Sequence, residues 1–145
     1  MIQTDCNFKI KKSILTEKEI NKVVVLASHQ EKKIKGVVEI NVISDKEMTR
    51  LNYQFRGKKY PTDVLSFAWQ EDQFIPTQYL GQIYICQNQI IRQAKEWEVT
   101  PRQEFARMLV HGLLHLVGYD HMEPQEAKKM FSLQENILKK AHYVR

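Results

Sequence analysis

The chain has 145 residues, of which 43% are hydrophobic and 27% are charged. This balance excludes a disordered chain and supplies enough apolar side chains for the core of one globular domain. The formal net charge of +5 favours polyanionic partners, but it is modest for a protein dedicated to binding nucleic acid.

The N-terminal region and the cysteines indicate a reducing compartment. The stretch MIQTDCNFKIKKS contains no apolar signal region, and the longest aliphatic run, VVVLA at 23–27, is far shorter than a membrane span. We therefore expect a cytoplasmic protein. Cys6 and Cys86 lie far apart in the chain and neither belongs to a CxxC pair, so two reduced thiols without a metal or disulfide role are expected.

The first half of the chain is expected to alternate between strands and helices. FKIKK at 8–12 favours a short first strand. A helix follows from Thr16, because one helical face collects Ile20, Val23, Val24 and Ala27. Alternating apolar residues predict a strand at 37–44. The capping-box pair of Ser44 and Glu47 then starts a helix near Asp45 that runs to about Arg56.

Two further strands are expected at 63–69 and 80–86, where β-branched and aromatic residues concentrate, with a polar, proline-containing loop between them. A helix at about 87–98 follows. Since no repeat, low-complexity segment or linker interrupts the chain, residues 1–145 are predicted to form one small α+β domain. Its mixed sheet would contain about four strands, covered by about five helices.

The next helix has the clearest start signal in the chain. Thr100 serves as N-cap, Pro101 occupies the first helical position and Gln103 completes a capping box. The helix is then apolar almost all round, which is typical of a fully buried helix. Gly118 ends it, because glycine readily adopts the left-handed conformation that turns the chain. A last helix is expected with Pro124 near its first turn.

Three of the five histidines occur in HGLLHLVGYDH at 111–121. His111 and His115 are four residues apart on the buried helix, so their Cβ atoms should lie roughly 5 to 6 Å apart on one face. His121 follows the turn at Gly118 and can return to the same point. Because three nitrogen ligands leave a fourth tetrahedral position for water, this spacing predicts one catalytic zinc ion. Three imidazoles also accept nickel, cobalt or copper.

The alternative is that these histidines are core residues with satisfied hydrogen bonds. One HxxxH pair would favour that interpretation, but three histidines at ligand spacing favour a metal, since each unpaired buried imidazole would cost about 1 to 3 kcal/mol. His29 and His142 lie in charged, exposed contexts and are assigned no role.

The residue after the first histidine distinguishes between chemistries. HExxH proteases carry a glutamate there that takes a proton from the metal-bound water, whereas this chain has Gly112. Peptide hydrolysis by that route is therefore not expected. An ion held by three neutral imidazoles keeps its full charge and can polarise an anionic oxygen, which suits phosphodiester substrates.

Two blocks carry a family resemblance. HGLLHLVGYDH, together with LNYQFRGKKYPTDVLSFAW at 51–69, resembles the bacterial YbeY family, the single-strand-specific endoribonucleases of ribosomal RNA maturation. LGQIYIC at 80–86 and a pattern formed by Glu126, Ala127 and Met130 extend the resemblance over most of the chain. The resemblance implies a small α+β fold, a catalytic arginine at Arg56, and zinc ligands at His111, His115 and His121.

The carboxylates near the predicted site are fewer than the resemblance implies. Family members commonly carry an aspartate after the glycine of LGQIYIC, where this chain has Gln82. Asp63 and Asp120 remain. Asp63 could instead cap the loop before its strand, and Asp120 is expected to orient His121.

Arg56 lies near a predicted helix end, where an arginine ordinarily interacts with the negative end of the helix dipole. With Lys58 and Lys59 around Gly57, however, its guanidinium could hold phosphate oxygens while the lysines follow the RNA backbone. The neighbouring aromatic rings either stack on bases or belong to the core, and the sequence leaves both possibilities open for Tyr53, Phe55 and Tyr60.

The resulting hypothesis is a single metal-dependent hydrolase domain: a zinc-dependent, single-strand-specific endoribonuclease acting in ribosomal RNA maturation and ribosome quality control. Its partners would be RNA and the ribosome, with no DNA or membrane partner. The nucleophile is either water or the RNA 2′-hydroxyl, and no general base is assigned. One alternative is a metalloprotease-like hydrolase with a displaced base. Another is a non-catalytic ribosome-assembly factor with a structural zinc.

Overall fold

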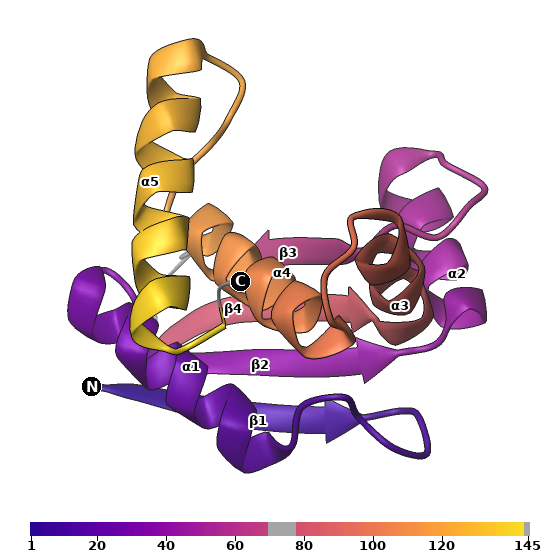
Figure 1. The fold of residues 1–145 in the computed structure, drawn as a ribbon. Coiled ribbons are helices and arrows are strands. Elements are labelled where there is room, and N and C mark those ends of the chain that lie inside the picture. The colour runs from indigo at the N-terminus through magenta and orange to yellow at the C-terminus, as the bar shows by residue number, and fades with distance from the viewer. Residues whose placement is uncertain (70–77, 144–145) are drawn as a thin grey trace.

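The computed structural model describes residues 1–69 and 78–143, and most of the loop predicted between the third and fourth strands lies outside them (Figure 1). The elements in chain order are β1 (Ile2–Phe8), α1 (Glu17–Gln30), β2 (Gly36–Ile43), α2 (Asp45–Arg56), β3 (Val64–Ala68), β4 (Tyr79–Cys86), α3 (Gln87–Glu96), α4 (Pro101–Leu116) and α5 (Pro124–Lys140). The four strands and five helices of this part of the chain confirm the predicted α+β class.

The four strands form one mixed sheet in the order β1-β2-β4-β3. β2 pairs in parallel with β1 and β4, whereas β3 runs antiparallel to β4 and forms an edge. Figure 1 shows α1 and α4 lying over one face of the sheet, with α5 against α4. The main core fills the space between these helices and the sheet, and a second, smaller core lies under α2.

The start signals of the helices are confirmed. Thr16 and Thr100 each form a complete capping box, and Pro101 occupies the first turn of α4. Ser44 caps α2 by accepting a hydrogen bond from the backbone N–H of Glu47 at 3.3 Å, but the return bond from the Glu47 side chain that the predicted capping box requires is not formed. Gly118, with φ of 100°, follows the end of α4 as predicted. These signals depend on residues within one turn of each other, so they can be recognised in the sequence.

Two element boundaries differ from the prediction. The strand expected at 8–12 is wrong, because β1 spans Ile2–Phe8 and pairs with β2 from Ile2 opposite Gly36 to Phe8 opposite Val42. The apolar residues of β1, Ile2, Cys6 and Phe8, alternate with polar residues and pack on the main core, so the signal of this strand lies upstream of the predicted range. The helix expected to reach residue 98 ends at Glu96, and Glu98 has φ of 56°, which no α-helix accommodates.

Gly112 lies where α4 packs closely on the sheet. A Cβ atom on this residue would lie 3.0 Å from Ser66 Oγ and 3.2 Å from Ile83 Cγ2. The Ser66 hydroxyl also donates a hydrogen bond to the Gly112 carbonyl oxygen at 3.2 Å. The position after the first histidine therefore faces β3 and β4, so a glutamate there would be directed into the packed sheet.

We expect Gly112→Ala to lower the free energy of unfolding by about 1 kcal/mol, because the Ser66 and Ile83 side chains must shift by a few tenths of an ångström and this cost exceeds the advantage of alanine over glycine within a helix. Urea denaturation followed by circular dichroism would measure this. The double variant Gly112→Ala with Ser66→Ala should recover part of the loss, since it removes the nearest clashing atom. Equal stability of Gly112→Ala and the parent would contradict the close packing.

Candidate metal centre

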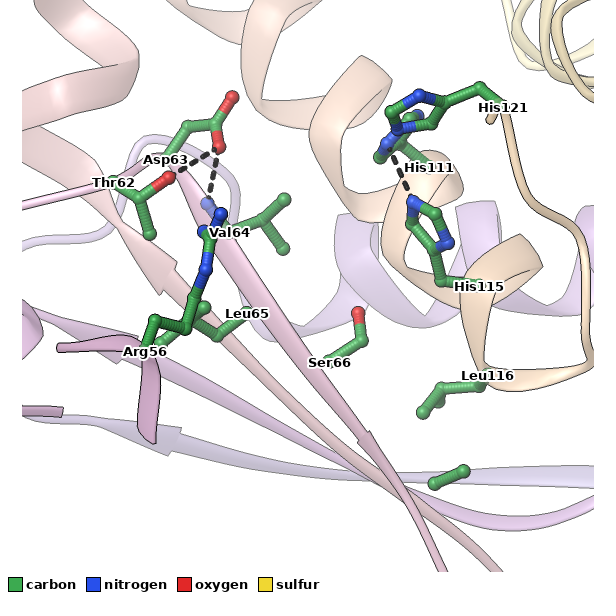
Figure 2. A pocket seen from close by; sticks show the side chains of 11 residues that line it. Arg56, Thr62, Asp63, Val64, Leu65, Ser66, His111, His115, Leu116 and His121 are labelled. Carbon is green, nitrogen blue, oxygen red and sulfur yellow. Dashed lines mark hydrogen bonds between the residues drawn. The ribbon is translucent and has the colours of Figure 1, made fainter. Parts of the chain in front are cut away.

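Helix α4 brings the first two histidines together. His111 and His115 project from one face of the helix, and their Nε2 atoms lie 3.0 Å apart (Figure 2). Two nitrogen atoms bound to one tetrahedral zinc ion at roughly 2.0 to 2.1 Å would be about 3.3 Å apart. The pair is thus already close to the separation that a shared ion requires.

The turn after α4 returns the third histidine to this pair. Gly118 donates its backbone N–H to the His115 carbonyl oxygen at 3.1 Å, and Tyr119 donates to the Leu114 carbonyl oxygen at 3.0 Å. These bonds close the helix and reverse the chain. As a result, one ligand nitrogen from each of His111, His115 and His121 lies within 4.8 Å of the other two. The three residues that the sequence predicted as ligands are brought together.

The donor set fits a zinc ion with an open coordination position. Among residues 1–69 and 78–143, the cluster that could hold a metal consists of these three histidines alone. A structural zinc site would ordinarily contain a fourth histidine or cysteine, whereas three histidines and an open position are typical of catalytic zinc.

The electrostatics around the two histidines of α4 favour neutral imidazoles. Burial lowers the pKa of His111, and the neighbouring rings of His115 and His121 lower it further. The pKa of His115 is also lowered, first by burial and then by His121. Because a metal competes with protons for these nitrogens, a lowered pKa leaves them available to an ion at neutral pH.

The cysteines take no part in this cluster. Cys6 and Cys86 are free thiols, as predicted. Burial raises the pKa of both to about 12, so neither is a thiolate at neutral pH.

Two residues of α5 contact the histidines and were not identified from the sequence. Gln134 accepts a hydrogen bond from His111 Nδ1 at 2.9 Å. The Phe131 ring stacks against His111 and His121 at centroid distances of 6.2 and 6.0 Å. The sequence contains one signal for Gln134, which is a polar residue on the otherwise apolar stripe of the last helix.

The histidines line a pocket of about 490 Å³ that also contains Arg56. Figure 2 shows Arg56 and Asp63 on one side of this pocket and the three histidines on the other. The full lining is Arg56, Thr62, Asp63, Val64, Leu65, Ser66, Ala68, His111, His115, Leu116 and His121. The two blocks that carry the predicted chemistry, far apart in the sequence, therefore face one cavity.

Arg56 is the last residue of α2, and Gly57 begins the following loop in the left-handed conformation with φ of 71°. Its side chain is exposed, and no carboxylate among the described residues forms an ion pair with it. Its guanidinium therefore retains its hydrogen-bond donors for an anion in the pocket.

The two aspartates near the site both accept hydrogen bonds, and one of these bonds comes from helix α3, where Gln93 Nε2 donates to Asp63 Oδ2 at 3.2 Å. Asp63 Oδ1 accepts hydrogen bonds from the Val64 backbone N–H at 2.7 Å and the Thr62 hydroxyl at 3.3 Å, so it does cap the start of β3. Asp120 accepts a hydrogen bond from the backbone N–H of His121 at 2.7 Å. The contact between Asp120 and this histidine is thus made to the backbone.

Gln82 does not line the metal pocket. Its side-chain amide donates a hydrogen bond to Glu39 at 2.8 Å. The next residue, Ile83, is buried and faces Gly112 of α4, so Gln82 points to the opposite face of the sheet. The absence of a negative charge at this position therefore leaves the lining of the histidine pocket unchanged.

The aromatic residues around Arg56 lie on the surface. Tyr53, Phe55 and Tyr60 are 56%, 54% and 57% exposed, so the alternative that these rings belong to the core is wrong. The Lys59 ammonium group lies 5.7 Å from the centre of the Tyr53 ring. Accessible rings and positive charges are therefore interleaved in the segment that precedes β3.

Comparison with known proteins gives one consistent family. The chain matches the family described as Endoribonuclease YbeY over residues 2–142. It is 37% identical to a Malacoplasma penetrans protein of that name, over 91% of this chain and 87% of the relative. A Bacillus licheniformis protein of the same name is 38% identical, over 83% and 82%. The solution structure of TM1509 from Thermotoga maritima superposes with a TM-score of 0.65 at 31% identity, covering 97% of this chain and 89% of that one.

Within residues 1–69 and 78–143, no helix is both long enough and apolar enough to cross a bilayer.

Proposed function

The chain belongs to the YbeY family of endoribonucleases, and from this premise we propose that it is a zinc-dependent endoribonuclease specific for single-stranded RNA. The observation that carries the proposal is the pocket in which His111, His115 and His121 face Arg56. A three-nitrogen ligand set and a guanidinium across one cavity form a site suited to a phosphodiester, whose charge both can stabilise.

In the proposed mechanism each residue has a separate task. The three imidazoles hold the ion, which when bound supplies Lewis-acid chemistry to the phosphate. Arg56 donates two parallel N–H bonds to phosphate oxygens and stabilises the negative charge that develops during cleavage. Gly112 cannot act as a base, so the chain does not use the arrangement of an HExxH protease.

The exposed rings support the preference for single strands. Residues 51–62 contain Arg56, Lys58 and Lys59 but no aspartate or glutamate. Lysines attract the phosphate backbone, and accessible rings such as Phe55 and Tyr60 stack on unpaired bases. Bases inside a duplex are already stacked on each other, so they cannot use these rings.

The proposed biological setting is ribosomal RNA maturation and ribosome quality control in the cytoplasm, with ribosomal RNA and the ribosome as partners and no role on DNA. This setting follows from family membership, and the net charge of +5 is compatible with it.

Metal analysis combined with a cleavage assay tests the proposal. We expect about one zinc ion per chain, cleavage of a single-stranded RNA oligonucleotide, and much slower cleavage of the same RNA annealed to its complement. Chelation should abolish cleavage and added zinc should restore it. Nickel and cobalt should be tested in parallel, because three imidazoles also accept them.

The same assay separates the alternatives. Chelator-sensitive cleavage of unfolded casein with intact RNA would indicate the metalloprotease. Binding of RNA without cleavage at any enzyme concentration would indicate the assembly factor.

A further inference from the structure

Gln134 is a polar residue at a buried position of α5. It is 2% exposed, and the residues on the same face of the helix, Met130, Ile137 and Leu138, are fully buried and apolar. A buried amide is costly unless it forms hydrogen bonds, whereas a methionine or leucine would fill the same space without that cost. Packing alone therefore does not explain a glutamine here.

The contact between Gln134 and His111 has a defined direction. Gln134 Oε1 is a carbonyl oxygen and can only accept, so the hydrogen on His111 Nδ1 must be the one donated across the 2.9 Å contact. A neutral imidazole carries one N–H. His111 Nε2 is then free of hydrogen, and it is this atom that lies 3.0 Å from His115 Nε2.

The contact between the two rings is compatible with this assignment. Its direction depends on the tautomer of His115, whose ring also forms a hydrogen bond with the backbone of Tyr119. If His111 carried its hydrogen on Nε2 instead, the lone pair that a metal needs would point at the amide of α5.

We propose that Gln134 is a positioning residue that holds His111 in the Nδ1–H tautomer and aims its Nε2 lone pair into the histidine cluster. The inference rests on the proposed metal site and adds to it a contact from a separate helix. Partners that bind the second nitrogen of a metal-bound histidine typically contribute 10- to 100-fold to metal affinity.

Two substitutions distinguish the contribution of the hydrogen bond to zinc affinity from the contribution of packing. Gln134→Met keeps a long, unbranched side chain but removes the acceptor, and we expect it to weaken zinc binding by about 10- to 100-fold in a competition titration with a chromophoric chelator. Gln134→Glu keeps an acceptor at the same distance, so its zinc affinity should equal or exceed that of the parent. Ile137→Val is the control, because it trims a buried side chain one turn along α5 and leaves the hydrogen bond between Gln134 and His111 in place.

The tautomer can be observed without any metal. Long-range ¹H–¹⁵N spectra of the metal-free protein should show His111 with its hydrogen on Nδ1, and Gln134→Met should shift it to a mixture of tautomers. An Nε2–H tautomer in the parent, or unchanged zinc affinity in Gln134→Met, would overturn the inference. Failure of the parent itself to bind zinc would instead overturn the proposed function, so the two failures are distinguishable.

Discussion

Arg56→Ala is expected to lower RNA cleavage by about a hundredfold or more while zinc content and melting temperature stay nearly unchanged. Losing one donor that stabilises developing charge typically has an effect of this size. The side chain is exposed and contacts none of the histidines, so neither the core nor the metal site should be disturbed. Single-turnover cleavage of a single-stranded RNA oligonucleotide would measure the loss.

Arg56→Lys tests how the residue acts. Lysine keeps the positive charge but cannot donate two parallel hydrogen bonds, so most of the activity should still be lost. Arg50→Ala, which removes an exposed arginine from the same helix, is the matched control and should cleave like the parent. If Arg56→Lys were as fast as the parent, Arg56 would be only a positive charge in a basic groove. Release of zinc or unfolding in Arg56→Ala would assign it a structural role.

Replacing any one of the three clustered histidines is expected to remove most of the bound zinc and to reduce RNA cleavage to background. Two imidazoles hold zinc far less well than three, and a lost ligand also changes the geometry of the ion. Metal content would be measured by mass spectrometry after dialysis of His111→Ala, His115→Ala and His121→Ala. His29→Ala and His142→Ala are the controls, because these histidines lie outside the cluster.

The result that would contradict this expectation is stoichiometric zinc in all three variants. An experimental structure of the loaded protein offers an independent check, in which the three nitrogen atoms should lie roughly 2.0 to 2.1 Å from the ion. A fourth protein ligand in that structure would favour the structural-zinc alternative over an enzyme.

Features that depend on neighbours in the chain were predicted well. The capping box at Thr100, the first-turn Pro101 and the helix-ending Gly118 act within a turn or two, and the structure has all three. The four-residue spacing of His111 and His115 places them together on any helix, so their proximity needs no tertiary information.

Features that depend on residues far away in the chain were predicted poorly. β1 was misplaced although its residues alternate, because the pairing that defines the strand is with β2, more than thirty residues away. The exposure of Tyr53, Phe55 and Tyr60 could not be decided, since aromatic residues are common both in cores and at binding surfaces.

The sequence by itself determined the chemistry of this protein: which imidazoles can share an ion, that no glutamate follows the first of them, and that an arginine and lysines precede the third strand. Only the tertiary structure decided which other residues pack against or contact these groups. Packing of α4 on the sheet leaves no space beside Gly112, α5 brings Gln134 to His111, and the end of α2 places Arg56 at the histidine pocket. Ligand spacing is a property of one helix and the turn that follows it, whereas these contacts join elements whose approach is set by burial of the shared core.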